Sequence, residues 1–301
     1  MEGEQQLARD EALLRRLRHV EIRARGLTHQ IFAGEYHSAF KGQGMAFSEV
    51  RAYQPGDDVR SIDWNVTARL GDPFVKIFEE ERELTVMLVV DVSGSNDFGS
   101  QSRAKREAMT EVAALLAFSA LQNNDKVGMI LFSDHVERFI PPVKGRRHAL
   151  RIIWELLSYS AQGSRTDIGG ALHFLTGAIK KRCTAFLLSD MLDFGAHQPR
   201  FQPALEIAAQ KHDLVALQVY DPREQALPCV GMVRFRDAES GQVRWLNTDR
   251  RRVRDGYANG WQVRQELIKR SFSRVGVDFE AISTTEDYVV PLAKLFKRRG
   301  R

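Results

Sequence analysis

The chain beyond residue 81 alternates between short apolar runs and longer segments with apolar residues at helical spacing. Continuous apolar runs of this length are typical of strands buried on both faces of a sheet. The predicted strands are Leu84–Val90, Lys126–Phe132, Cys183–Ser189, Leu214–Tyr220 and Val277–Ile282, with Glu137–Ile140 as a short edge strand. The predicted helices are Arg103–Gln122, Arg147–Tyr159, Ile168–Lys180, Pro203–Lys211, Arg250–Arg274 and Asp287–Lys297. This alternation predicts an α/β fold, with a doubly wound, mostly parallel sheet and helices on both faces.

The first 80 residues follow a different pattern. Apolar residues recur at helical spacing in Asp10–Arg25, and Gly26 follows as a stop signal. Glycines then divide the chain into short pieces, with strand-like segments at Ala46–Tyr53 and Phe74–Phe78 on either side of a turn at Gln54–Asp58. We therefore expect a small accessory module in residues 1–80 and a large sheet domain in residues 81–301. Within the sheet domain, Met232–Arg236 and Val243–Leu246 alternate around Glu239–Gly241 and predict a hairpin.

Composition narrows the class of protein. The 301 residues are 43% hydrophobic and 28% charged, which is ordinary for a globular chain and excludes disordered, collagen-like and disulfide-stapled proteins. Two scattered cysteines, Cys183 and Cys229, favour a reducing compartment. The longest apolar runs fall far short of the ~20 residues that a membrane span needs. We therefore expect a soluble cytoplasmic protein.

The net charge of +5 is not spread evenly along the chain. Residues 1–80 carry 11 basic and 13 acidic side chains, so the remaining residues carry 33 basic and 26 acidic ones. The excess gathers at Arg250–Arg254 and Lys297–Arg301. Such clusters would suit nucleic acid or anionic lipid, but no aromatic-rich binding motif accompanies them. We treat nucleic-acid binding or membrane-surface contact as an alternative function, and the solvated face as the simpler interpretation.

Oxygen-bearing side chains follow two of the predicted strands. The segment Asp91–Ser95 (DVSGS) ends the first strand of the sheet domain, and Ser189–Asp190 ends another. A hydroxyl from the loop Gly163–Asp167 (GSRTD), just before a predicted helix, would join them. Two carboxylates and three hydroxyls form an all-oxygen shell suited to Mg²⁺, with Mn²⁺ or Ca²⁺ as substitutes. A metal held mainly by hydroxyls keeps positive charge and can accept a carboxylate from another molecule.

This order of residues resembles the metal-ion-dependent adhesion site of von Willebrand factor A domains. The resemblance covers roughly residues 81–296 and implies the same fold. In such domains the two serines and the threonine bind the metal directly, while the aspartates often act through water. The positions that the resemblance assigns to the metal are Asp91, Ser93, Ser95, Thr166 and Asp190.

The N-terminal segment is similar to a bacterial family called domain of unknown function 58. The matching strings are Gly34–Ser38 (GEYHS), Gly42–Gly44 (GQG), Arg51–Trp64 (RAYQPGDDVRSIDW) and Ala68–Arg69, just ahead of Glu79–Glu80. Asn96 departs from the methionine common in the family, at a position that is not a ligand. The resemblance implies association with MoxR-type AAA+ ATPases and no established catalytic activity. The simplest interpretation of the long string is structural: its aspartates cap a turn and pair with Arg51, Arg60 or Arg69, and Trp64 anchors the module in the main core.

An enzyme is the main rival interpretation, because a carboxylate-bound Mg²⁺ can hydrolyse phosphoesters. No general base is evident, however, and the sequence lacks a His-Glu-x-x-His zinc pattern, a phosphate-binding loop and a Gly-x-Ser-x-Gly elbow. We therefore expect a non-enzymatic, metal-dependent protein–protein interaction protein. Its expected partner is a MoxR-type AAA+ ATPase or a client of that ATPase, supplying an Asp or Glu to the metal.

Overall fold

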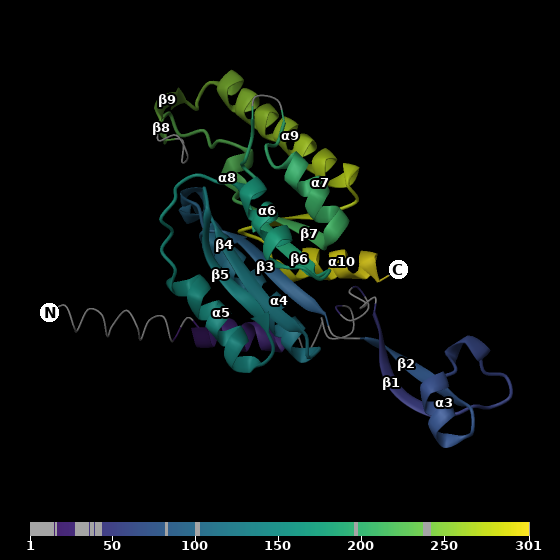
Figure 1. Cartoon of the computed structure of the whole chain (residues 1–301). Helices are drawn as coiled ribbons and strands as arrows, with labels where there is room; N and C mark the ends of the chain where they lie inside the picture. Colours follow the sequence, from purple (N-terminus) through teal and green to yellow (C-terminus); the bar gives the residue numbers. More distant parts are fainter. Residues whose placement is uncertain are drawn as a thin grey trace. The chain divides into compact units, whose positions relative to one another are not determined.

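The chain forms two compact units in a computed structural model (Figure 1). The described residues are 15, 17–27, 36, 39, 44–81, 84–99, 103–195, 198–236 and 242–300. Residues 41–84 make one unit, here called the ribbon unit, and residues 1–40 with 85–301 make the other, the sheet unit. The described residues between 15 and 39, which the sequence analysis assigned to the accessory module, group with the sheet unit.

The helical segment 17–27 is fixed to the sheet unit by its own side chains. Val20 and Ala24 are buried, and Glu21 accepts a hydrogen bond from Arg146 at 2.6 Å. Tyr36 is fully buried, with its ring edge-on to Phe296. These apolar contacts explain why the segment groups with the sheet. The expected start of the helix, at residues 10–14, lies outside the described residues.

A six-stranded sheet forms the centre of the sheet unit. Its order is β10-β7-β6-β3-β4-β5, with only the edge strand β5 antiparallel. The strands are β3 (Thr85–Asp91), β4 (Lys126–Phe132), β5 (Val136–Val143), β6 (Thr184–Ser189), β7 (Asp213–Tyr220) and β10 (Asp278–Ser283). This confirms the predicted mostly parallel α/β fold. The edge strand β5 is longer than predicted and contains Pro141 and Pro142.

The side on which successive strands are added to the sheet changes at β3. From β3 the chain passes to β4 and β5 on one side, then crosses to β6, β7 and β10 on the other. The gap between the carboxyl ends of β3 and β6 is therefore the topological switch point, where ligands of open α/β sheets usually bind.

Helices cover both faces of the sheet (Figure 1). Met87 and Val89 of β3 share a core with buried residues of α6, α7 and α9. The alternate residues Val86, Leu88 and Val90 are also buried, and α4 packs against β3, β4, β6 and β7. The helices are α4 (Lys105–Gln122), α5 (Arg146–Ser158), α6 (Ile168–Ala178), α7 (Gln202–Lys211), α9 (Arg251–Arg274) and α10 (Val289–Arg299). Burial on both faces explains the unbroken apolar runs in the sequence.

An insertion between β7 and α9 carries the predicted hairpin. It begins with the short α8 (Pro222–Gln225) and continues to β8 (Met232–Arg236) paired with β9 (Val243–Asn247). Phe235 packs edge-on against Tyr257 of α9, whereas Met232 and Trp245 on the other face are exposed. The expected turn at Glu239–Gly241 lies outside the described residues. No described helix is both long and apolar enough to cross a membrane.

The ribbon unit is built from local contacts. Its strands β1 (Gly44–Ala52) and β2 (Phe74–Glu81) are antiparallel, and η2 (Val59–Ser61) and α3 (Trp64–Leu70) lie between them in sequence. Asp57 forms two 2.7 Å hydrogen bonds with the Arg51 guanidinium. Asp58 caps η2 and Asp63 caps α3. The structural interpretation of this string is thus confirmed for its aspartates.

Trp64 does not pack within the ribbon unit itself. Its side chain is 66% exposed, because it stands on the first turn of a seven-residue helix that has no buried residue.

Candidate metal centre

The structure places the predicted carboxylates at the switch point of the sheet. Asp91 is the last residue of β3, and Asp190 directly follows β6. The two strands are paired up to Val90 and Leu188, so their ends leave the sheet side by side. Both aspartates are almost completely buried. The β3–β6 register therefore brings together two carboxylates that are 99 residues apart in sequence.

The three predicted hydroxyls also meet here. Ser93 and Ser95 follow β3 and lie 3.2 Å apart, Oγ to Oγ. Thr166 enters from the loop before α6 and donates from its Oγ1 to the Ser93 Oγ at 3.0 Å. All three are buried, whereas the neighbouring hydroxyl residue Ser164 is exposed. The structure thus selects Thr166 rather than Ser164 as the loop's contribution to the cluster.

The spacing of these hydroxyl oxygens fits the shell of a small octahedral cation. Adjacent ligands held ~2.1 Å from Mg²⁺ at right angles lie about 3.0 Å from each other. The Ser93 Oγ lies 3.0 Å from the Thr166 Oγ1 and 3.2 Å from the Ser95 Oγ. Donors are hard oxygens throughout, as Mg²⁺ prefers. The described part of the chain has no group of three or more His, Cys, Asp or Glu side chains that could hold a metal, so any ion at this site would rely on hydroxyl ligands.

Asp91 is held in one orientation by two donors. The Ser93 backbone N–H donates to its Oδ1 at 2.9 Å, and the Ser189 hydroxyl donates to its Oδ2 at 2.7 Å. Burial and the negative charge of Asp190 raise the pKa of Asp91 to about 6. Ionisation of Asp91 is therefore unfavourable unless a cation lies close to it. A cation bound beside Asp91 would stabilise the ionised carboxylate.

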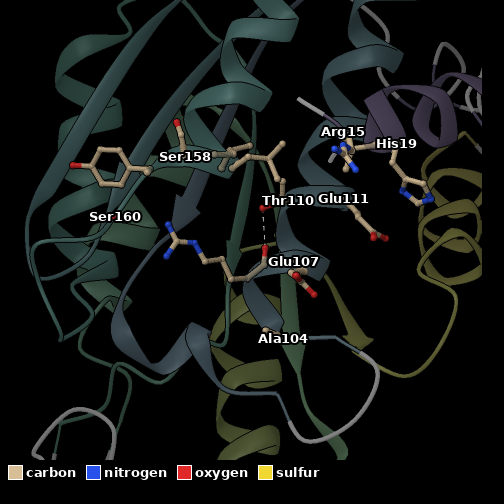
Figure 2. A pocket seen from close by; sticks show the side chains of 13 residues that line it. Arg15, His19, Ala104, Glu107, Thr110, Glu111, Ser158 and Ser160 are labelled. Carbon is tan, nitrogen blue, oxygen red and sulfur yellow. Dashed lines mark hydrogen bonds between the residues drawn. The ribbon is translucent and has the colours of Figure 1, made fainter. Parts of the chain in front are cut away.

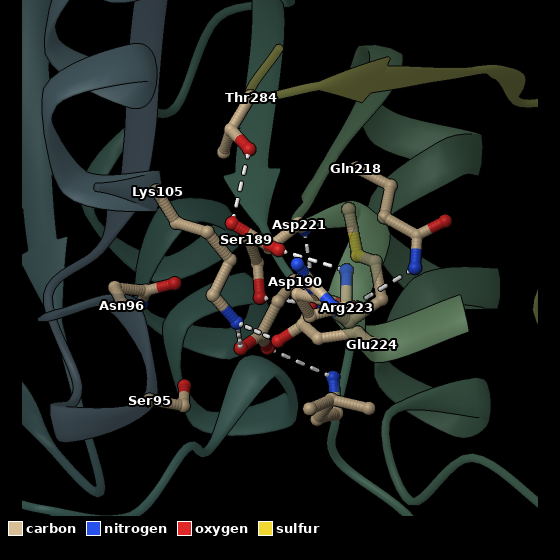
Figure 3. A network of polar contacts seen from close by, with 12 residues as sticks. Ser95, Asn96, Lys105, Ser189, Asp190, Gln218, Asp221, Arg223, Glu224 and Thr284 are labelled. Atoms are coloured by element: carbon tan, nitrogen blue, oxygen red, sulfur yellow. Dashed lines mark hydrogen bonds and ion pairs between the residues drawn. The ribbon is translucent and has the colours of Figure 1, made fainter. Parts of the chain in front are cut away.

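Asp190 has a positive partner of its own, Lys105 (Figure 3). The Lys105 Nζ lies 2.8 Å from Asp190 Oδ2 and 2.5 Å from Glu224 Oε1. The Lys105 side chain has no exposed surface. Burial alone would lower the pKa of Lys105, but the charges of Asp190 and Glu224 outweigh it and raise that pKa above its ordinary value. Lys105 is therefore a permanent ammonium beside the candidate metal centre.

Several residues that orient the site were missed by the sequence analysis. Asn96 is fully buried and donates from Nδ2 to the Asp91 carbonyl and to the Ser93 hydroxyl. Lys105 opens a largely buried helix, but the charged residues Arg106 and Glu107 follow it, so the sequence does not single it out. Glu224 carries no sequence signal either, because it lies in the insertion after β7.

The backbone next to Asp190 is strained. Met191 is buried and has φ 62°, in the left-handed region that is unfavourable for a side chain with a β-carbon. Its N–H donates to the Ser189 hydroxyl at 3.0 Å, and the Leu192 N–H donates to Asp190 Oδ1 at 3.1 Å. This turn aims one serine at Asp91 and one carboxylate at Lys105. Strained backbone of this kind is concentrated at functional sites.

A cavity elsewhere on the sheet unit does not contain any of the predicted metal ligands (Figure 2). Its volume is about 760 Å³. It is lined by Arg15 and His19 of the N-terminal segment, by the first turns of α4 and by the end of α5 around Tyr159. Within it, the Thr110 hydroxyl donates back to the Arg106 carbonyl at 2.8 Å.

Comparisons with known proteins agree with the long motif near the N-terminus. A family model described as "Protein of unknown function DUF58" matches residues 49–267. The uncharacterized protein Rv1480 of Mycobacterium tuberculosis is 30% identical over 294 residues, which are 97% of this chain and 91% of that protein. The uncharacterized protein YeaD of Bacillus subtilis is 30% identical over 101 residues, which are 34% of this chain and 23% of that protein.

Similar solved structures include von Willebrand factor A domains, the class that the sequence resembles. A von Willebrand factor type A protein from Catenulispora acidiphila is 13% identical with a TM-score of 0.42, covering 75% of this chain and 43% of that one. The conserved hypothetical protein BatB from Bacteroides thetaiotaomicron is 18% identical with a TM-score of 0.47, covering 72% and 98%.

Proposed function

The chain belongs to the DUF58 family of proteins of unknown function, and we propose that it is a non-enzymatic adaptor that binds a protein partner through a divalent metal. The observation that carries this proposal is the hydroxyl cluster around Ser93 Oγ, spaced like adjacent ligands of an octahedral ion and flanked by two buried carboxylates.

Each predicted residue has a distinct part in holding the ion. Ser93, Ser95 and Thr166 would bind it through their hydroxyl oxygens, while Asp91 and Asp190 would act through water. When bound, Mg²⁺ supplies a positive charge with room for a carboxylate from an Asp or Glu of the partner. The chain's own residues keep the hydroxyls and carboxylates in place: Asn96 orients Ser93, and Ser189 orients Asp91.

The contacts of the site support docking rather than hydrolysis. Among the described hydrogen bonds, the side-chain oxygens of the five predicted ligands contact serine, threonine, asparagine and lysine side chains and backbone N–H groups, and no histidine. A phosphoesterase would need a group that activates water or protonates the leaving group. The candidates here are Asp91 and Lys105, and both are engaged by neighbours: Asp91 by Ser93 and Ser189, and Lys105 by Asp190 and Glu224. An adaptor needs only the open position on the metal.

The basic C-terminus also favours a protein partner over nucleic acid. Arg299 is paired with Asp213 and Asp278, and Arg298 lies near Asp278 and Glu280. Arginines engaged in such pairs are less available to phosphates. The first partner to test is a MoxR-type AAA+ ATPase or a client of that ATPase, as the family resemblance implies.

A capture experiment tests this function. The full chain is immobilised and exposed to native lysate, and to a purified MoxR-type ATPase, in Mg²⁺ and in EDTA. Thr166→Val removes one hydroxyl of the cluster. Thr176→Val is the matched control, because the hydrogen bond described for the Thr176 hydroxyl is a local one, to the His173 carbonyl.

We expect capture in Mg²⁺ by the wild type and by Thr176→Val, and loss of capture in EDTA or with Thr166→Val. Capture that ignores both EDTA and Thr166→Val would contradict the metal-dependent interaction. Metal-dependent hydrolysis of a phosphomonoester that disappears in Asp190→Asn would contradict the non-enzymatic assignment and favour the phosphoesterase.

A further inference from the structure

The ammonium of Lys105 is enclosed between two carboxylates next to the metal centre. Its side chain is fully buried, and Nζ contacts Asp190 Oδ2 at 2.8 Å and Glu224 Oε1 at 2.5 Å (Figure 3). Asp190 is one of the five predicted ligands, whereas Glu224 comes from the insertion after β7. The site thus already contains one cation, the ammonium of Lys105. Neither Lys105 nor Glu224 is among the five predicted ligands.

The position of Lys105 in its helix is unfavourable on electrostatic grounds. Lys105 is the first residue of α4, where the N-terminal end of the helix dipole favours negative rather than positive charge. Ala104 at the N-cap provides no side-chain hydrogen bond to this end. The ammonium is therefore held in place by Asp190 and Glu224, rather than by the helix that carries it.

Glu224 is itself fixed in a way that keeps it directed at Lys105. Its Oε2 accepts the backbone N–H of Asp221 at 3.0 Å, as one half of a capping box on α8. The carboxylate of Asp221 accepts from the Arg223 N–H and from the Thr284 hydroxyl. Glu224 therefore holds the ammonium and is tied away from the cluster of hydroxyls.

We propose that Lys105 is a resident monovalent cation that keeps the affinity of the strand-end site for divalent metal low, so that a metal is held tightly only when a partner adds its own carboxylate. This inference rests on the proposed function. The local charges are three carboxylates, Asp91, Asp190 and Glu224, against one ammonium. A divalent ion entering the site is repelled by Lys105, and it competes with Lys105 for Asp190. A partner's carboxylate would offset the positive charge of Lys105, which couples metal retention to partner binding.

A simpler interpretation is that the Lys105 network only stabilises the fold, since a buried ion pair is weak evidence for any other role. The two interpretations predict opposite changes in metal affinity for Lys105→Met. If Lys105 weakens metal binding, Lys105→Met tightens it and Glu224→Gln weakens it further, because the ammonium then has Asp190 as its only charged partner among the contacts described for it. If the network is merely structural, both substitutions disturb Asp190 and both weaken binding.

The experiment is a calorimetric titration of the purified full chain with Mn²⁺ alone, without any partner. We expect Lys105→Met to bind Mn²⁺ about tenfold more tightly than the wild type, and Glu224→Gln to bind it several-fold more weakly. The rise in melting temperature caused by Mn²⁺ is a second readout and is expected to follow the same order. Asp57→Asn in the ribbon unit removes a carboxylate from an ion pair outside the sheet unit and serves as the matched control, with unchanged affinity.

Lys105→Met leaves the buried carboxylate of Asp190 and the partly buried one of Glu224 without their cation, and the variant could fail to fold for that reason. The double variant Lys105→Met/Glu224→Gln removes one charge of each sign and keeps the side-chain volumes similar. We expect it to fold and to bind Mn²⁺ more tightly than Glu224→Gln. Binding by the double variant no tighter than by Glu224→Gln would overturn the role of Lys105.

Failure of this inference is distinguishable from failure of the proposed function. Wild-type binding of Mn²⁺ with equal or weaker binding by folded Lys105→Met overturns the inference and leaves the metal site standing. Absence of Mn²⁺ binding in the wild type and in all variants overturns both. Binding that emerges only when Lys105 is replaced supports the inference, because the ammonium then accounts for the low affinity.

Discussion

Asp91 offers a direct test of the electrostatics of the site through the variant Asp91→Asn. The pKa of Asp91 is raised from 3.8 to about 6 by burial and by the charge of Asp190. At ~1.4 kcal/mol per unit, the ionised carboxylate costs the native state about 3 kcal/mol at neutral pH. The folded pKa lies above the unfolded one, so this cost is absent below about pH 4 and grows until about pH 6. The wild type therefore loses stability at this residue as pH rises through that window.

Asparagine has nearly the same shape as aspartate but carries no charge. Its Oδ1 can still accept from the Ser93 N–H, while the bond donated by the Ser189 hydroxyl to Oδ2 is lost at a cost of about 1 kcal/mol. We expect Asp91→Asn to be less stable than the wild type by about 1 kcal/mol near pH 4, and more stable by 1 to 2 kcal/mol, roughly, near pH 7.5.

Urea unfolding of both proteins at the two pH values measures this crossover. The difference between variant and wild type must be used, because His212 acts in the opposite sense. Burial lowers the pKa of His212 to about 4, so its contribution to stability is lost as pH falls from about 6.5 to about 4. That contribution is common to both proteins and cancels.

Addition of Mg²⁺ extends the test to the metal. A cation near Asp91 favours the ionised carboxylate, so Mg²⁺ is expected to stabilise the wild type at neutral pH and to have little effect on Asp91→Asn. A variant that is destabilised equally at both pH values would refute the electrostatic argument.

Two further predictions concern residues around the site. Asn96→Met is expected to change the free energy of unfolding by no more than about 1 kcal/mol. The substitution loses the two hydrogen bonds donated by Nδ2, but it also removes the buried Oδ1, which has no hydrogen-bond partner among the described residues. Urea unfolding tests this, and a loss of several kcal/mol would contradict it. A thiol reagent is expected to label Cys229 rapidly and Cys183 only on unfolding. Cys229 is exposed, whereas burial raises the pKa of Cys183 to about 12. Rapid labelling of both thiols in the native protein would contradict this prediction.

Most of the sheet unit could be predicted from the sequence, because its strands are buried on both faces. β3 and β6 are short apolar runs whose residues are almost all buried, so each strand can be predicted from its own segment of sequence. The ribbon unit was harder to predict from the sequence. α3 has no buried residue and is fixed by the Asp63 cap, so it leaves no apolar periodicity to detect, and its Trp64 is exposed rather than packed.

The positions of the candidate ligands could be predicted from where the strands end, but the residues that contact those ligands could not. Asp91 and Asp190 could be placed because parallel strands bring their carboxyl ends to one edge. Lys105 and Glu224 are 119 residues apart, and only the folded chain shows that they share an ion pair. The left-handed conformation of Met191 is equally invisible, since methionine carries no signal for a positive φ.

The two prolines in β5 limit how another protein can approach the sheet. Pro141 and Pro142 lie in the outermost strand, between Ile140 and Val143, which pair with β4. Proline has no N–H to donate, so a strand of a second molecule cannot continue the ladder along this stretch. Binding modes in which a peptide extends a sheet, and the edge-to-edge stacking that leads to aggregation, are disfavoured here. If the strand-end site binds a partner as proposed, the contact would be made through side chains rather than by extension of the sheet at β5.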